Sequence, residues 1–295
     1  MSVFLNSRGD LRTVWKFASF VSVWLPAWIA VSVALRLVFN GINSSRDDLY
    51  RLALDVVINL IPAIVATLFA TRIVEDIPVQ SLGLGFHEYW KLNLIAGFSI
   101  GGFLLILVVA GAKTFGEFQL DWAPYINPGR LLLTLGILIV AAAFEELIFR
   151  GYPMQVLMKG MGPWPAMLIM STLFGLLHAG NLNSSVLGVF NTIVAGFMLS
   201  LAYFKTRSLW FPYGLHLAWN VGTGIVVGFP LSGTAFESIW TAHVNGPSWL
   251  LGADYGPEGG LLGTLIFLAG TVVVWKLPTK QMKYDNRLHQ DSSAG

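Results

Sequence analysis

The sequence contains no cysteine and has few charged residues for its length. Without cysteine the chain has no disulfide, no thiolate ligand for zinc and no thiol nucleophile. Only 12% of the 295 residues are charged, whereas soluble domains have about a quarter, and 55% are hydrophobic. The formal net charge is +2 and the basic residues are scattered, which argues against nucleic acid as a partner. The composition therefore excludes an ordinary soluble globule and indicates an integral membrane protein.

Long apolar runs account for this composition. A helix needs about 20 apolar residues to cross a hydrocarbon core of roughly 30 Å, and the sequence has eight candidate runs. In lipid the backbone polar groups must be satisfied within each segment, so these runs are expected to be helices. We predict an all-α polytopic membrane protein with about eight transmembrane helices and one domain, residues 1–295. The runs are 17–35, 56–71, 92–112, 131–149, 164–178, 186–204, 209–228 and 261–275.

Basic residues are unevenly divided between the two sides of the membrane. If the N-terminus is cytoplasmic, 13 Lys and Arg residues lie inside and 5 outside, and none lies in the loop 229–260. Positive residues favour the cytoplasmic side, so we predict that both termini are cytoplasmic, with the protein in the plasma (inner) membrane. Five tryptophans fall at the ends of runs on that side, as an aromatic belt would place them. They are Trp15, Trp90, Trp164, Trp210 and Trp275.

Three charged residues close the fourth apolar run, in the segment AAAFEELIFR. Ionisable groups inside a span cost about 2.5 to 3.5 kcal/mol each on insertion scales, so each one needs a reason. Glu145 and Glu146 point about 100° apart on a helix, and Arg150 can pair with Glu146 at i, i+4. One interpretation is that these charges only mark the cytoplasmic end of the helix. The other is that they belong to a buried site.

The depth of His178 in the fifth run favours the buried site. The strongest turn signal nearby is centred near residue 161, so we expect the helix with the glutamates to continue to about Met158, with Pro153 as a kink. Glu145 then lies 16 residues before the turn and His178 lies 17 after it. In an antiparallel hairpin both would lie about 24 Å from the turn, at one depth. If the helix instead ended at Phe149, His178 would lie far from the glutamates.

Two further pairs have the same four-residue spacing and therefore share a helix face. Phe174 precedes His178 in STLFGLLHAG, and His216 precedes Asn220 in FPYGLHLAWN. Taken singly, His and Asn residues in spans are more often core or interhelical hydrogen-bonding residues than catalysts. We expect that packing role for three other polar residues in the runs, which are Asp55, Asn59 and Asn191.

Together these side chains have the chemistry for hydrolysis of an amide. A buried carboxylate can act as general base toward water, and His and Asn can donate hydrogen bonds to the oxyanion of a tetrahedral intermediate. Two histidines and a glutamate can also hold a divalent metal such as zinc. The ligands would then be Glu145, His178 and His216. The residues alone leave both mechanisms open. The zinc signature H-E-x-x-H is absent.

The order and type of these motifs resemble those of the CPBP family, the CAAX proteases and bacteriocin-processing enzymes, also called the Abi family. The resemblance covers about residues 131–228, which would form the catalytic core, with the site between the fourth, fifth and seventh helices. The motifs are Glu145-Glu146-x-x-x-Arg150, Phe174-x-x-x-His178 and His216-x-x-x-Asn220.

The resemblance implies a membrane endopeptidase, either a metalloendopeptidase or a glutamate-dependent enzyme. Its catalytic residues would be Glu145, Glu146, His178, His216 and Asn220, with Arg150 and Phe174 in support. The first three would handle the water, with Glu145 as general base, and the last two would stabilise the oxyanion. The expected partners are the lipid bilayer and a membrane-associated peptide or protein substrate. The alternative is a non-catalytic scaffold, or a small-molecule or proton transporter, that uses the same buried polar residues.

Overall fold

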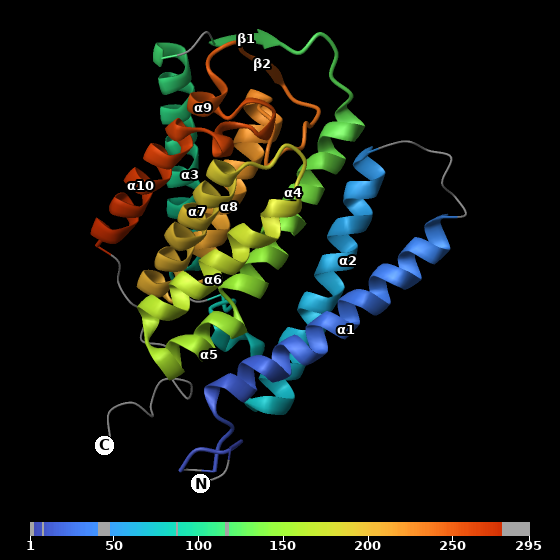
Figure 1. Cartoon of the computed structure of the whole chain (residues 1–295), viewed down its shortest axis with the longest axis vertical. Helices are drawn as coiled ribbons and strands as arrows, with labels where there is room; N and C mark the ends of the chain where they lie inside the picture. The colour runs from blue at the N-terminus through green and yellow to red at the C-terminus, as the bar shows by residue number, and fades with distance from the viewer. Residues whose placement is uncertain (1–2, 8, 41–47, 87, 116–117, 279–295) are drawn as a thin grey trace.

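The structure is a computed structural model that describes residues 3–7, 9–40, 48–86, 88–115 and 118–278, so most of the predicted cytoplasmic C-terminal tail lies outside the described residues. The chain forms a bundle of helices with a small two-stranded sheet at one end (Figure 1). The predicted all-α polytopic fold is confirmed. The main elements are α1 (Thr13–Asn40), α2 (Asp48–Phe69), α3 (Trp90–Phe115), β1 (Phe118–Trp122), α4 (Pro128–Phe149), α5 (Tyr152–Met161), α6 (Pro163–Leu177), α7 (Val186–Thr206), α8 (Trp210–Asn220), β2 (Trp240–Val244), α9 (Ser248–Leu251) and α10 (Leu261–Lys276).

Each of the eight predicted runs coincides with a helical segment, but their lengths differ. In the described part of the chain, five segments are long and apolar enough to cross a membrane: α1, α2, α3, α4 together with α5, and α7. Helices α6 and α10 have 15 and 16 residues, and α8 has 11 residues followed by a seven-residue π-helix, Val221–Val227. The predicted count of eight spans is therefore not confirmed.

The helix that carries the glutamates is shorter than predicted. It ends at Phe149, and α5 begins after Gly151 and turns aside from the α4 axis (Figure 1). A Cβ on Gly151 would lie 2.1 Å from the carbonyl oxygen of Leu147, so the backbone of this break requires glycine. Pro153 lies in the first turn of α5, where backbone N–H groups have no partner within the helix, so proline is tolerated there. The predicted continuation of the α4 helix to the next turn is wrong, because Gly151 and Pro153 override the apolar pattern.

Helix α8, which carries His216, lies in close backbone contact with α3. A Cβ added to Gly97 would lie 2.1 Å from the carbonyl oxygen of Phe211, and one added to Gly101 would lie 2.4 Å from that of Leu215. Small residues allow such close approach between membrane helices. The two glycines therefore fix the distance of α8 from α3 and, with it, the position of the third motif.

The tryptophans of the predicted aromatic belt gather at one end of the bundle. The rings of Trp90 and Trp210 are 5.2 Å apart where α3 and α8 begin. The rings of Trp164 and Trp275 are 5.5 Å apart, joining the start of α6 to the end of α10. At the opposite end β1 pairs antiparallel with β2 (Figure 1), a pairing that was not predicted. Which end faces the cytoplasm stays a prediction from the loop charges.

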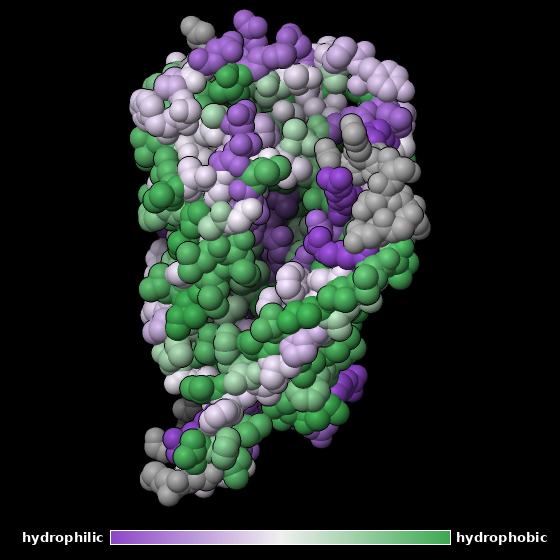
Figure 2. Space-filling model, turned by 45° about the vertical axis from the view of Figure 1, so that its right-hand side comes forward, coloured by the Kyte–Doolittle hydropathy of each residue, from purple (hydrophilic) through white to green (hydrophobic). Residues whose placement is uncertain are grey.

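The outer surface of the bundle is largely apolar. Hydrophobic residues cover much of the face shown in Figure 2, while hydrophilic residues gather toward one end and in a hollow within the hydrophobic zone. Helix α1 presents apolar side chains outward, among them Ile29 (49% exposed) and Leu37 (72% exposed). Such a surface is expected of a protein that faces lipid. The chain is an integral membrane protein.

Candidate active site

A cavity of about 620 Å³ lies within the bundle and is lined by residues of α1, α2, α4, α6, α7 and α8. All three motifs meet at this cavity, although α4, α6 and α8 are separated in the chain. Two motif residues, Glu146 (2% exposed) and Arg150 (0% exposed), are buried behind its wall. Five predicted site residues line the cavity itself: Glu145, Phe174, His178, His216 and Asn220.

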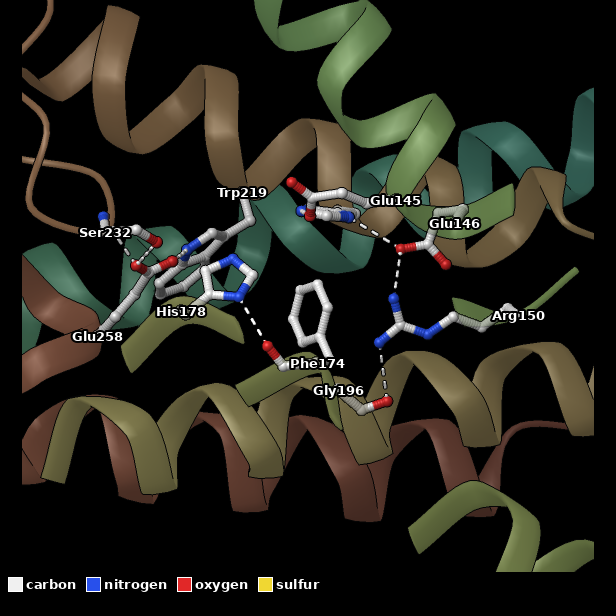
Figure 3. Close-up of polar contacts among 10 residues, drawn as sticks. Glu145, Glu146, Arg150, Phe174, His178, Gly196, Trp219, Ser232 and Glu258 are labelled. Atoms are coloured by element: carbon white, nitrogen blue, oxygen red, sulfur yellow. Dashed lines mark hydrogen bonds and ion pairs between the residues drawn. The ribbon is translucent and has the colours of Figure 1, made fainter. Parts of the chain in front are cut away.

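The first motif forms a buried ion pair at the end of α4. The Nη1 of Arg150 donates to Oε1 of Glu146 at 3.0 Å, so the predicted i, i+4 pair is confirmed. The Nη2 of Arg150 donates to the carbonyl oxygen of Gly196 at 3.0 Å (Figure 3). Because Gly196 belongs to α7, the guanidinium joins the end of α4 to α7 as well as neutralising a carboxylate.

His216 lies between the two adjacent glutamates. Its Nδ1 is 2.8 Å from Oε1 of Glu146, and its Nε2 is 3.6 Å from Oε2 of Glu145. An ionised carboxylate can only accept, so Nδ1 carries a proton and donates to Glu146. The groups therefore follow one another in the order Arg150, Glu146, His216 and Glu145. Of these four groups Glu145 and His216 line the cavity, and the side chain of Glu145 is the more exposed, at 21% against 9%.

The second motif fixes the tautomer of a second histidine. The Nδ1 of His178 is 2.7 Å from the carbonyl oxygen of Phe174 (Figure 3). A carbonyl oxygen only accepts, so Nδ1 carries the proton and Nε2 of the neutral ring is left with a free lone pair. The rings of Phe174 and His178 are 4.5 Å apart, which confirms the predicted contact between them.

The structure places His216, and not His178, beside Glu145. Among the hydrogen bonds of the described residues, none joins Glu145 to His178. Both side chains nevertheless line the same cavity, even though the helix with Glu145 ends at Phe149. The expectation that a short α4 would separate the two motifs is wrong, because α5 is a separate oblique helix and the simple hairpin geometry does not apply.

Phe174 contacts charged or titratable groups of all three motifs. The guanidinium carbon of Arg150 lies 4.7 Å from its ring centroid, in a cation–π contact. The ring of His216 meets it edge to face, at 6.2 Å and 90°. With His178 on a third side, this one aromatic ring contacts the Arg150 guanidinium and both imidazoles.

Asn220 lies one turn after His216 and is the last residue of α8. It is 9% exposed and lines the cavity beside His216. The helix changes to a π-helix at Val221, immediately after this residue. Short π-helical segments are rare and frequently lie at functional sites.

The predicted metal ligands do not form a grouped donor set. Within the described residues, no three His, Cys, Asp or Glu side chains are arranged to hold a metal ion. Both nitrogens of His216 already face carboxylates, and Nδ1 of His178 is bound to a backbone carbonyl. The side chains present therefore do not fit a zinc site formed by Glu145, His178 and His216.

Asn59 and Asn191 join neighbouring segments by hydrogen bonds, as predicted. The indole N–H of Trp28 on α1 donates to Oδ1 of Asn59 on α2 at 3.1 Å. The amide of Asn191 on α7 donates to the carbonyl oxygen of Gly260 at 2.8 Å, which holds the start of α10. Asn59 also lines the cavity, together with its neighbour Asp55.

One functional candidate was missed from the sequence. Glu258 is 8% exposed and lines the cavity, although it lies in a loop far along the chain from the three motifs. The signal available was an acidic residue, one of three in the loop 229–260, that lies close to several glycines in a segment without Lys or Arg. No spacing rule connects such a residue with a helix motif, so only the structure places it there.

Comparison with known proteins identifies the segment that carries the motifs. Comparison with curated proteins gives no match. Residues 127–222 match the Rce1-like family model, described as type II CAAX prenyl endopeptidase Rce1-like. This segment is about a third of the 295 residues and runs from the N-cap of α4, Asn127, to just past Asn220. The predicted resemblance to the CPBP family is therefore confirmed, through an Rce1-like segment that contains all three motifs.

Proposed function

We propose that this membrane protein is an intramembrane endopeptidase that hydrolyses a peptide bond of a membrane-associated protein or peptide. The observation that carries the proposal is the convergence of motif residues from α4, α6 and α8 on one cavity of about 620 Å³. The description of the matching family supports the reaction class and points to CAAX-type processing. Isolated buried charges would be costly in a membrane, whereas a shared site gives each of them a role.

In the proposed mechanism Glu145 acts as general base. A water held between Glu145 and the free Nε2 of His178 gives one proton to the carboxylate as its oxygen attacks the peptide carbonyl carbon. The carbonyl electron pair moves to oxygen and forms a tetrahedral oxyanion. Glu145 then returns the proton to the amide nitrogen, the C–N bond breaks, and a new carboxyl and amine are released. His178 orients the water through its lone pair.

The third motif would stabilise the oxyanion. The Asn220 side-chain amide can donate directly. His216 can donate from Nε2 only when it is protonated on both nitrogens, since Nδ1 already donates to Glu146. The carboxylates of Glu145 and Glu146 lie on either side of that ring, 3.6 and 2.8 Å from its nitrogens. In this assignment Arg150 holds Glu146 in place by its ion pair, and Glu146 accepts from His216.

Hydrolysis in detergent tests the proposal. Purified wild-type protein should cleave members of a peptide library, and Glu145→Gln should not. Asp121→Asn is the matched control, because Asp121 is an acidic residue on β1 with a side chain that is 68% exposed. Cleavage by Glu145→Gln at the wild-type rate would overturn the assignment of the general base. Proton or solute flux in vesicles without any cleavage would instead favour a transporter.

A further inference from the structure

Glu258 is a buried carboxylate that the proposed reaction does not use. It lies in a single 3-10 turn, Pro257–Gly259, between α9 and α10. It lines the same cavity as Glu145 but lies beyond the segment 127–222 that matches the family model. A buried carboxylate in a membrane protein is costly unless hydrogen bonds satisfy it, so its partners indicate its role.

Three donors occupy both oxygens of Glu258 (Figure 3). Oε1 accepts from the indole Nε1 of Trp219 at 2.8 Å. Oε2 accepts from the backbone N–H of Ser232 at 2.9 Å and from its hydroxyl at 2.5 Å. With both oxygens engaged in this way, the carboxylate is placed to connect two parts of the chain and not to take a proton from substrate.

The parts that Glu258 connects are α8 and the loop after it. Trp219 precedes Asn220 directly on α8, and its ring packs 4.7 Å from that of Phe267 on α10. The loop residue Ser232 lines the cavity as well. The backbone of Glu258 is itself held, because the Asn191 amide donates to its carbonyl oxygen at 2.8 Å. The carboxylate is therefore a fixed point between α7, α8 and the loop.

We propose that Glu258 is a positioning residue that holds the end of α8 and the Ser232 loop in one arrangement, and so directs Asn220 into the cavity. The hydrogen bonds by which Glu258 joins Trp219 to Ser232, here called the Glu258 tie, are independent of any reaction. Its consequence for Asn220 rests on the proposed function. Loss of the tie should therefore lower kcat, where oxyanion stabilisation acts, and leave KM unchanged.

Replacement of Glu258 by glutamine tests the tie with little change of shape. Glu258→Gln substitutes an NH₂ for one of two oxygens that now accept, so a donor must face either the Trp219 indole or the Ser232 amide. We expect kcat to fall by about tenfold or more. Trp219→Phe removes the indole N–H, one of the two donors that the new NH₂ group could face. The double variant should therefore lose less activity than the product of the two single losses.

A thiol-reactivity measurement makes the test independent of hydrolysis. Leu231, beside Ser232, is 7% exposed, and the native chain has no cysteine to interfere. In a Leu231→Cys background, Glu258→Gln should speed thiol modification by about tenfold, as local opening becomes easier. The control is Met154→Cys, at a site that is 0% exposed on α5, where the rate should not change.

The outcomes separate this inference from the proposed function. An unchanged rate at Leu231→Cys, an equal increase at Met154→Cys, or multiplicative losses in the double variant would overturn the role of Glu258. If wild-type protein cleaves nothing, the proposed function fails, and the thiol rates alone decide whether Glu258 holds the loop. Faster modification confined to Leu231→Cys, together with a loss in kcat that Trp219→Phe partly offsets, would support the full proposal.

Discussion

Removal of the Arg150 side chain should destabilise the fold more than any other single change in the three motifs. The guanidinium is 0% exposed and joins Glu146 at 3.0 Å to the carbonyl oxygen of Gly196 at 3.0 Å. It also lies 4.7 Å from the Phe174 ring centroid. Arg150→Ala would delete all of these contacts and leave the carboxylate of Glu146, which is 2% exposed, without its cation.

The magnitude follows from the burial of both partners. Breaking a buried ion pair by removing one member costs about 3–5 kcal/mol, because the remaining charge is left uncompensated. His216 still donates to Glu146 in this variant and offsets part of the cost. We therefore expect Arg150→Ala to lower the free energy of unfolding by about 3 kcal/mol, near the lower end of this range. Arg150→Lys should be intermediate, since an ammonium keeps the charge but loses the planar fork that reaches both acceptors.

Thermal unfolding in detergent provides the assay, and a paired replacement provides the control. Arg150→Met keeps an apolar side chain but leaves the buried carboxylate of Glu146 without its cation. Arg150→Met combined with Glu146→Gln removes both charges. The double variant should therefore unfold at a higher temperature than Arg150→Met alone. A midpoint for Arg150→Ala equal to that of wild type would refute the reasoning, as would a double variant less stable than the single one.

Three further predictions concern chemistry and topology. Glu145→Gln and His178→Ala should each lower peptide hydrolysis by about a hundredfold or more while the protein still purifies as a monodisperse species; retention of near wild-type turnover by either would remove that residue from the mechanism. An impermeant thiol reagent should label Ser248→Cys, which is exposed beyond the end of β2, in intact cells, and should label Ser7→Cys only after the cytoplasmic face is opened; the reverse pattern would invert the topology. Chelators should leave hydrolysis unchanged, because the described His and Glu side chains are not grouped as metal ligands. Elemental analysis that finds about one zinc per wild-type protein, and none in His178→Ala, would contradict this prediction.

The helices and the contacts within each of the first two motifs could be predicted because both depend on local chemistry. Apolar runs become helices in lipid wherever they occur, and each predicted run coincides with a helical segment. The pairing of Glu146 with Arg150 and the contact of Phe174 with His178 need only a four-residue spacing on one helix. These contacts were confirmed because no information from another helix is required to place them.

Contacts between helices could not be predicted in the same way. Residue spacing fixes the depth of a side chain along its helix but not the rotation or tilt of that helix relative to its neighbours. The sequence therefore paired Glu145 with His178, whereas the structure places His216 beside Glu145. The break at Gly151 was missed for a similar reason. Its backbone geometry redirects α5, so the depths of Glu145 and His178 cannot be obtained by counting residues from the turn.

Phe174 explains why an aromatic residue belongs in a motif whose chemistry is polar. An aliphatic side chain could fill the same space, but only a ring offers a face to the Arg150 guanidinium and an edge contact to His216 at once. The ring thereby packs on the Arg150 guanidinium, while the backbone carbonyl of Phe174 fixes the tautomer of His178. Of the four groups in this chain, Glu145 and His216 line the cavity, whereas Glu146 and Arg150 are buried behind its wall. Glu145, and not Glu146, is therefore the carboxylate of the first motif that lines the cavity, as the proposed general base requires.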